Sequence, residues 1–367
     1  MASHKHAQVF SILRREIQSG RWRVGDRLPS EAELVQRFGH SRITIGRALR
    51  DLQAEGVIER RAGSGTYVRG PSANSSLSFG LLIPDLGVTD IFEPMCQGMM
   101  DSRLARQHAL IWGSGAGDDD ARALTKSERA WELAQHYLER GISGLFFAPL
   151  EHVADKDAVN LRIARAFDEA RIPVVLLDRP LTPFPNPGRH DVVGIDNRTA
   201  GFVVADHLLK LGCRRLAFVA LPNAAATVDA REAGYREALY SRHALVDHDL
   251  VRRLDPDDEV AVADLMRQQP DGIVCANDRT AGRLMHALRR LGHAVPRDVR
   301  LVGIDDVEYA SLLPIPLTTL RQPTRHIGEV ALGVMLTRIA QRDLPPRDVR
   351  IPCELVVRES CGAKGDR

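Results

Sequence analysis

The sequence predicts two unlike parts, a small winged helix-turn-helix domain and, behind it, an α/β domain of two lobes. Three short helical patterns followed by a basic hairpin pattern occupy the first 70 residues. Beyond residue 79, short apolar runs alternate with amphipathic helical stretches, which is the pattern of parallel sheets covered by helices on both faces. The intervening residues 71–78 are small and polar, as in a linker. We therefore expect a small winged helix-turn-helix domain at residues 1–70, a linker at 71–78 and a two-lobed domain at 79–361.

The length and composition fit a globular protein with more than one core. The chain has 367 residues, 44% of them hydrophobic and 27% charged, values typical of globular domains. Residues 1–70 hold 13 of the 50 Lys and Arg residues and 7 of the 48 Asp and Glu residues, a net charge of +6, whereas the remainder carries −4. This asymmetry favours a polyanionic partner for the first part. The alternative is a basic solvated surface without a partner.

Cysteine usage and hydropathy predict a cytoplasmic location. The five cysteines are odd in number and scattered, without a Cys-x-x-Cys pair, so a disulfide framework or a zinc site is not expected and a reducing compartment is favoured. The polar start of the chain lacks the apolar core of a secretory signal, and no apolar run approaches the roughly 20 residues of a membrane helix. We expect no membrane contact, no metal and no cofactor.

The helices of the first part can be placed from their apolar spacing and their capping residues. Helical spacing relates the first apolar set, Val9, Ile12, Leu13 and Ile17. Ser30 and Glu33 form a capping box that opens a second helix, which Gly39 can end. Ser41 is expected to cap a third helix that runs to about Glu55. Two short helices joined by a tight turn predict a helix-turn-helix.

The third helix carries an apolar stripe on one side and basic residues on the other. The stripe consists of Ile45, Ala48, Leu49 and Leu52. The opposite side carries Ile43, Gly46, Arg47 and Arg50, with Arg42 at the N-terminal flank. An arginine-rich outer face is typical of a helix that enters the major groove, where arginine can bond guanine bidentately. The alternative is an arginine-bearing helix exposed to solvent.

A basic hairpin is predicted directly after the third helix. Residues 57–60 and 66–68 have strand-like composition, and residues 61–65 between them contain two glycines. A glycine tip can approach a phosphate or the minor groove closely, and Arg60 and Arg61 lie beside it. The order helix, helix, helix, basic hairpin is that of a winged helix, and it makes the solvated alternative less favourable.

Over about residues 7–69 the sequence resembles the GntR family of bacterial regulators. The matching segments include 25–31 (Gly-Asp-Arg-Leu-Pro-Ser-Glu), 41–42 (Ser-Arg) and 63–68 (Gly-Ser-Gly-Thr-Tyr-Val). The resemblance implies double-stranded DNA as a partner. It further implies recognition-helix contacts from Arg42, Thr44 and Arg47, an orienting or contacting role for Glu31, and a wing tip at Gly63 and Gly65.

The sequence departs from this family at two positions. Gly46 stands where the family usually has a larger, often basic residue, and a glycine there should weaken the helix by roughly 0.5–1 kcal/mol. His40 replaces the usual apolar residue before Ser41. Both departures bear on base preference and not on DNA binding itself.

The second part contains apolar runs that fit strands covered on both faces. These runs include residues 79–83, 109–112, 145–148, 174–177, 192–195, 216–220, 273–276 and 301–304. Helical stretches lie between them, among them 95–106, 200–211, 230–240 and 281–291. About ten such units exceed one comfortable sheet, so two lobes are expected.

Polar residues directly follow several of these strands. The set is Asp85, Asp178 with Arg179, Asn277 with Asp278, and Asp305 with Asp306. Ligands of open α/β sheets bind outside the carboxyl ends of the strands, so these side chains should converge where two such edges face each other. Hydroxyl groups donate to carboxylates and accept from arginine, which suits a polyol. The alternative is a helix cap or a salt bridge between lobes, which we favour for Asp278 and Asp306.

Over about residues 79–360 the sequence resembles the effector domain of LacI-type regulators, which is similar to periplasmic sugar-binding proteins. Matching segments include 172–179, 193–197, 276–278, 302–306 and 316–323. The resemblance implies a periplasmic-binding-protein-like fold with lobes at roughly 79–190 with 318–342 and 191–306 with 347–361, joined by three crossings. It implies ligand positions at Phe92, Arg179, Arg231, Asn277, Asp305 and Gln322. Residues 89–92 depart from the family's pattern, so the stacking wall around Phe92 should be thinner.

These features predict a ligand-responsive DNA-binding transcription regulator and not an enzyme. We expect a homodimeric repressor of carbohydrate-utilisation genes, which a sugar or polyol effector releases from its operator. One alternative, a solute-binding protein, would need a signal peptide and no basic head. Another, an enzymatic body with a DNA-binding head, would need a Schiff-base lysine after a strand, and none of Lys126, Lys156, Lys210 and Lys364 is so placed.

Overall fold

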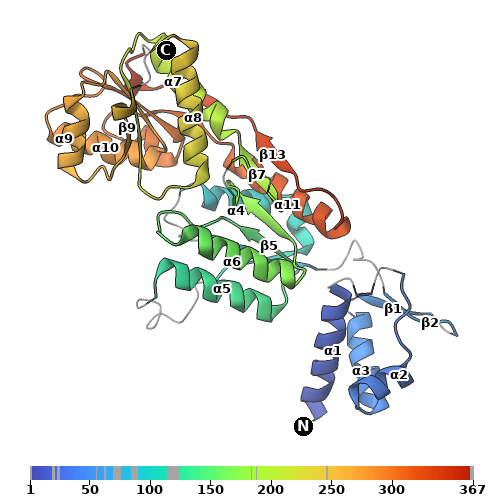
Figure 1. Cartoon of the computed structure of the whole chain (residues 1–367). Coiled ribbons are helices and arrows are strands. Elements are labelled where there is room, and N and C mark those ends of the chain that lie inside the picture. The colour runs from blue at the N-terminus through green and yellow to red at the C-terminus, as the bar shows by residue number, and fades with distance from the viewer. Residues whose placement is uncertain are drawn as a thin grey trace.

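The computed structural model describes residues 2–18, 21–22, 25–54, 56–61, 63–68, 76–83, 90–113, 124–182, 184–186, 188–244 and 247–363. A small helical domain lies at the N-terminal end, and two α/β lobes follow it (Figure 1). The predicted linker falls mostly outside the described residues, but the first strand of the lobes begins at Ser78, the last residue assigned to that linker.

The described part of the small domain holds three helices and a hairpin. They are α1 (Ala2–Gln18), α2 (Glu31–Phe38), α3 (Arg42–Ala54), β1 (Ile58–Arg61) and β2 (Gly65–Val68). The predicted capping box between Ser30 and Glu33 is present, and Gly39 ends α2 at φ 64°. Ser41 Oγ accepts from the Thr44 backbone N–H at 3.3 Å, as expected of a cap. The predicted end of α3 at Glu55 lies just outside the described residues.

Buried apolar side chains of the three helices and the hairpin form one core in this domain. Its members are Val9, Leu13, Leu28, Leu34, Ile45, Ala48, Leu49, Leu52, Ile58 and Val68. The whole predicted stripe of α3 is therefore buried. Because this stripe faces the core, the opposite face of α3 points away from the domain.

The first lobe is a six-stranded parallel sheet with strand order β13-β7-β6-β5-β3-β4. Its elements are β3 (Ser78–Leu82), α4 (Phe92–Asp101), η1 (Arg103–Gln107), β4 (Ala109–Ile111), α5 (Lys126–Arg140), β5 (Gly144–Phe147), α6 (Lys156–Glu169), β6 (Val174–Leu177), β7 (Asp191–Ile195), α11 (Thr324–Ala340) and β13 (Asp348–Ile351). Three of the strands, β3, β5 and β6, are buried along nearly their whole length, as expected for a sheet covered on both faces.

The second lobe is a six-stranded sheet with strand order β14-β12-β11-β10-β8-β9, in which only β14 is antiparallel to its neighbour. Its elements are α7 (Asn197–Lys210), β8 (Leu216–Ala220), α8 (Ala226–Ser241), η2 (His248–Leu250), β9 (Val251–Arg253), α9 (Glu259–Arg267), β10 (Gly272–Cys275), α10 (Asp278–Arg290), β11 (Arg300–Asp305), η3 (Glu308–Ser311), β12 (Thr318–Arg321), β14 (Glu354–Val356) and η4 (Glu359–Cys361).

The predicted lobe boundaries are wrong at three strands. β7 pairs with β6 and β13 pairs with β7, so both belong to the first lobe, whereas β12 pairs with β11 in the second. The chain therefore crosses between lobes after β7, after β12 and after β13. The predicted number of crossings is confirmed, but each lies a few residues later in the chain than expected, because a strand completes its sheet before the chain leaves the lobe.

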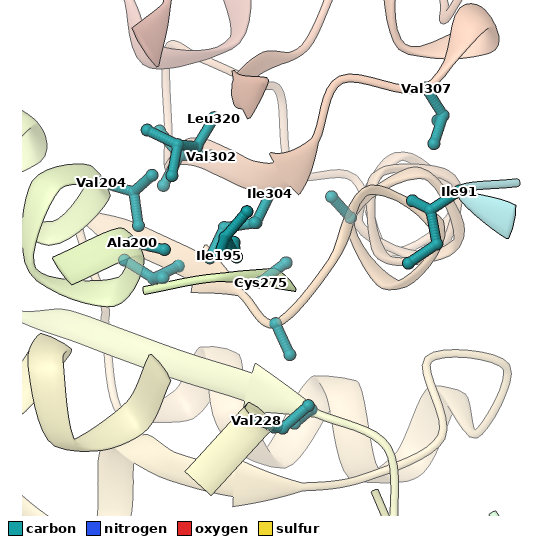
Figure 2. Packing of buried hydrophobic residues seen from close by; sticks show 14 of the residues in the cluster. Ile91, Ile195, Ala200, Val204, Val228, Cys275, Val302, Ile304, Val307 and Leu320 are labelled. Atoms are coloured by element: carbon teal, nitrogen blue, oxygen red, sulfur yellow. The ribbon is translucent and has the colours of Figure 1, made fainter. Parts of the chain in front are cut away.

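Buried apolar residues near the crossings link the two lobes. Ile91 and Ile195 of the first lobe belong to the same cluster as Val302 and Ile304 of the second (Figure 2). The crossing segments are therefore packed into the hydrophobic core. This packing fixes the position of the carboxyl edge of one sheet relative to that of the other.

Candidate DNA interface and effector site

The outer face of α3 is exposed and basic. Arg47 and Arg50 are both exposed, and the Arg42 side chain is 82% exposed. The hydroxyl groups of Thr44 and Ser41 lie 3.0 Å apart at the start of the helix. Guanidinium and hydroxyl donors are therefore gathered on the first two turns, the part of a recognition helix that meets base edges.

The Glu31 side chain connects the recognition helix α3 to strand β1 of the hairpin. Its carboxylate accepts from Arg60 Nη2 at 2.7 Å and from Arg42 Nε at 3.2 Å. Burial opposes ionisation of Glu31, but the hydrogen bonds from the two arginines outweigh it and lower the pKa of the carboxyl. This geometry supports the predicted orienting role of Glu31. It also adds Arg60, which the sequence placed beside the hairpin without assigning it to the site.

The hairpin has the backbone of a close-approach wing. Gly63 and Gly65 adopt φ of 72° and 130°, which a residue with a side chain rarely adopts. A Cβ on Gly65 would lie 2.7 Å from Arg27 Nε, so a larger residue there would also displace the Arg27 side chain. Arg61 lies over the Tyr67 ring, with its guanidinium carbon 4.7 Å from the ring centroid. The wing therefore carries an arginine side chain next to a tip that contains two glycines.

Replacing Gly46 tests whether a glycine at this position weakens α3, as the sequence predicts. A Cβ there would meet only Glu31 Oε1, at 3.9 Å, so Gly46→Ala should be accommodated and should stabilise α3 by roughly 0.5–1 kcal/mol. Hydrogen exchange of the α3 amides in the full chain should slow by about two- to fivefold. Gly65→Ala is the matched control and should speed exchange in the wing. Unchanged or faster exchange in Gly46→Ala would contradict this account of the helix.

In the first lobe, the candidate effector site centres on Arg179. This residue follows β6 and is 4% exposed. Its Nη1 lies 2.5 Å from Glu151 Oε1, and its Nε lies 3.2 Å from Asp178 Oδ2. Its guanidinium carbon lies 5.5 Å from the ring centroid of Phe92 at the start of α4. Burial opposes the charge on Glu151, but Arg179 and then His152 outweigh it and lower the pKa of Glu151 to about 2.

In the second lobe, Arg231 on α8 holds a second polar cluster. Its Nε donates to Asn197 Oδ1 at 2.8 Å and its Nη1 donates to the Ala276 carbonyl at 2.6 Å. Its Nη2 lies 3.7 Å from Asp305 Oδ1, which also accepts from Gln322 Nε2 at 2.6 Å. Three predicted ligand positions, from α8, the end of β11 and the crossing after β12, are therefore brought together.

Close packing of α7 against α8 places Arg231 in this cluster. A Cβ on Gly201 would lie 1.9 Å from the Arg231 carbonyl oxygen, and a Cβ on Gly234 would lie 1.8 Å from the Arg198 carbonyl oxygen. Only glycines allow the two helices to approach so closely. The approach brings Arg231 within reach of Asn197, the first residue of α7.

The two clusters face each other across the lobes. Burial is the main cause of the raised pKa of Asp305 in the second lobe, and Asp178 of the first lobe is close enough to add to it. Burial and then Asp90, which precedes α4, raise the pKa of Tyr309 in η3. The loops are also joined directly, because the His152 backbone N–H donates to the Asn223 carbonyl at 2.8 Å. The predicted site therefore lies between the carboxyl edges of the two sheets.

Unpaired buried oxygens mark this site as one that can take a ligand. Among the described residues, Asp178 Oδ1 and Gln322 Oε1 are buried without a hydrogen-bond partner in the protein. A buried unpaired acceptor costs about 1–3 kcal/mol. Asp178 and Asp305 also adopt positive φ, at 68° and 132°, and such backbone strain gathers at binding sites. Both acceptors would be satisfied by hydroxyl groups of a bound molecule.

The remaining strand-end residues divide between structural roles and the site. Asp306 pairs with Arg321 and Arg358, both at 2.6 Å. Its role is therefore structural, as favoured, but the expected salt bridge between lobes is wrong, because both partners lie in its own lobe. The predicted cap at Asp278 is wrong: Asn277 caps α10 by accepting from the Thr280 N–H at 2.8 Å. The cap falls one residue earlier because α10 begins at Asp278 itself.

Asp278 is instead a buried member of the cluster around β11. Its Oδ1 accepts from the Thr319 hydroxyl at 2.5 Å and its Oδ2 from the Val307 N–H at 3.1 Å. Burial raises the pKa of Asp278 to about 6. Asn277 remains a predicted ligand residue, with its carbonyl oxygen used by the cap and its amide NH2 group left to donate. Asp85, which was also predicted, lies outside the described residues.

Asp305 predicts a pH-dependent stability. Burial, opposed by Arg231 and supported by Asp278, raises the pKa of Asp305 to about 8. A pKa raised on folding contributes stability that is fully present below the unfolded value near 4 and is lost as the pH rises towards 8. Replacing Asp305 with a residue that does not ionise should therefore reduce the loss of stability as the pH rises.

We expect Asp305→Asn to flatten the fall in unfolding free energy between about pH 4 and 8, by up to about 1.4 kcal/mol per pH unit. Urea unfolding at a series of pH values measures this slope. Asp157→Asn, at an exposed carboxylate of α6, is the control and should follow the wild type. Parallel curves for Asp305→Asn and the wild type would show that Asp305 is ionised throughout.

The described part of the chain shows neither a metal-binding group nor a membrane-spanning helix. No group of three or more His, Cys, Asp and Glu side chains in that part of the chain could hold a metal ion. No helix there combines the length and apolar character needed to cross a membrane.

Comparison with known proteins matches both parts of the chain. The model for bacterial regulatory proteins of the gntR family covers residues 5–68, and the model for a periplasmic binding protein-like domain covers residues 205–361. The arabinose metabolism transcriptional repressor of Geobacillus stearothermophilus is 26% identical over 97% of each chain. The ribose operon repressor of Halalkalibacterium halodurans is 23% identical over 88% of this chain and 94% of its own.

Solved structures share the fold. A complex of the transcriptional regulator CelR with cellobiose superposes with a TM-score of 0.64, at 24% identity over 88% of this chain and 91% of that chain. A transcriptional regulator of the LacI family from Sanguibacter keddieii superposes with a TM-score of 0.59, at 27% identity over 78% of this chain and 100% of its own. Each of these relatives is named as a transcriptional repressor or regulator.

Proposed function

The chain combines a GntR-type winged helix-turn-helix domain with a LacI-type effector domain, and from this premise we propose that it is a sugar-controlled repressor of carbohydrate-utilisation genes. It binds operator DNA through the outer face of α3 and the wing, and it acts in the cytoplasm, where the operator is. The relatives named as repressors of arabinose and ribose genes support this function.

The effector is an uncharged sugar or related polyol. Arg179 already pairs with Glu151 and Asp178, and Arg231 lies beside Asp305. Because Arg179 already has two carboxylate partners, an uncharged ligand fits beside it better than a phosphorylated one. The observation that carries this proposal is the pair of unpaired buried acceptors, Asp178 Oδ1 and Gln322 Oε1, which require donors such as hydroxyl groups.

Two copies of the chain act together on a pseudo-palindromic operator. A two-fold symmetric body would place two heads on successive major grooves of one face of the duplex. Effector binding shifts the relation of the lobes through the three crossings and thereby changes the spacing of the heads. An allosteric coupling of about 1–3 kcal/mol would change operator affinity by roughly 5- to 150-fold.

Two experiments test the halves of this function separately. Selection of random duplexes by the full chain at low ionic strength should enrich one pseudo-palindromic sequence. A thermal-shift panel of neutral sugars, polyols and sugar phosphates should show stabilisation by a neutral member, by about 2.7 kcal/mol at 100 times its dissociation constant. Stabilisation by sugar phosphates alone would overturn the effector class, and enrichment of no sequence would overturn the DNA-binding function.

A further inference from the structure

Ile43 is exposed where the fold gives it nothing to contact. Its side chain is 82% exposed, whereas Ile45, Leu49 and Leu52 on the same helix are buried. A large apolar side chain in water adds nothing to the core, and β-branched residues are only moderate helix formers. The folding of the domain therefore does not explain an isoleucine at this position.

The position of Ile43 is that of a base-reading residue. It is the second residue of α3, directly after the exposed Arg42. Residues four apart share one face of a helix, so Ile43 and the exposed Arg47 lie on the same face, away from the core. The first turns of a recognition helix are the part that enters the major groove.

Gly46 leaves the helix surface bare beside Ile43. It lies three residues after Ile43, and a Cβ there would meet only Glu31 Oε1, at 3.9 Å. The protein itself therefore does not require glycine at this position, although glycine weakens a helix. Because glycine has no side chain, a base edge can come close to the helix backbone between Ile43 and Arg47.

The apolar group that a base pair presents in the major groove is the C5 methyl group of thymine. We propose that Ile43 reads the C5 methyl group of a thymine in each half-site of the operator. This inference rests on the DNA-binding function proposed above and adds an apolar specificity contact to the hydrogen bonds made by the arginines. Burial of one methyl group is worth about a fourfold change in affinity.

Deoxyuridine differs from thymidine only in lacking this methyl group, so it tests the contact directly. Starting from the selected duplex, each thymine is replaced in turn by uracil in both half-sites, and affinity is measured by fluorescence anisotropy. At one position the wild type should bind the uracil duplex more weakly, by about fourfold per half-site. Ile43→Ala should bind the thymine and uracil duplexes equally, and Ile43→Val should keep part of the difference.

Val260→Ala removes an exposed apolar side chain from α9 of the body, where 77% of Val260 is exposed. This control should show the same preference for thymine as the wild type. Equal binding of every thymine and uracil pair by the wild type, or an undiminished preference in Ile43→Ala, would overturn the proposal. Both results leave operator binding intact, which distinguishes them from the selection of no duplex, the outcome that refutes the DNA-binding function.

Discussion

Replacing Arg179 with alanine is expected to abolish the response to the effector while leaving operator affinity unchanged. The guanidinium lies between Glu151 and Asp178 at the carboxyl edge of the first lobe. Its loss removes donors from the proposed ligand site and leaves the carboxylates of Glu151 and Asp178 without their arginine partner. The proposed operator contacts lie on the separate small domain, so we expect them not to depend on this residue. Thermal shift with the identified sugar and anisotropy with the selected duplex measure the two properties independently.

The same variant should be strongly destabilised, which calls for a second variant. Removing one partner of a buried ion pair costs about 3–5 kcal/mol, a large part of the 5–15 kcal/mol that stabilises an ordinary domain. The double variant Arg179→Ala with Glu151→Gln removes one of the two orphaned charges and should recover stability without recovering effector binding. Arg162→Ala, at an exposed arginine of α6, is the matched control for charge and should respond normally. A normal effector response in the double variant would show that the site lies elsewhere.

Replacing Arg47 with alanine is expected to remove specific operator binding while effector binding persists. Arg47 is exposed on the outer face of α3, where a bidentate contact to guanine is worth about 1–3 kcal/mol. In a symmetric complex this loss applies at each half-site, so affinity should fall by at least about fivefold per half-site. Binding to random duplex should change much less, because phosphate contacts supply most of it.

Arg267→Ala provides the control for Arg47, since it removes an exposed arginine from α9 of the body. Its operator affinity should match that of the wild type. Equal operator binding by Arg47→Ala and the wild type would remove the recognition-helix assignment, even if the domain still bound DNA through the wing.

The sequence predicted the fold correctly where the local structure depends on residues that are adjacent in the chain. The bounds of β6 and β8 coincide with apolar runs read from the sequence, and the Ser30 capping box set the start of α2. β12 has no such signal, because only one of its four residues, Leu320, is a large apolar residue and it is recognisable only by its pairing with β11. The lobe boundary at β12 was misplaced for this reason.

The candidate site was predictable only in part, because ion pairing depends on tertiary structure. Arg179 and Asp305 were placed in it because they follow strands. Glu151 lies four residues beyond the end of β5, and Asn197 opens a helix, so neither position distinguishes itself in the sequence. Their roles emerge only when Glu151 meets Arg179 and Asn197 meets Arg231. Glu31 was expected from the family resemblance, but its two arginine partners come from different elements and could not be predicted.

We propose that one chain couples the binding of a small molecule between its lobes to the binding of a duplex by its N-terminal domain. This coupling is tested by titrating the selected operator duplex with the full chain, at fixed ionic strength, with and without a saturating concentration of the identified sugar. We predict that the sugar weakens operator affinity by about 5- to 150-fold. Identical binding curves in the two conditions would contradict the claim.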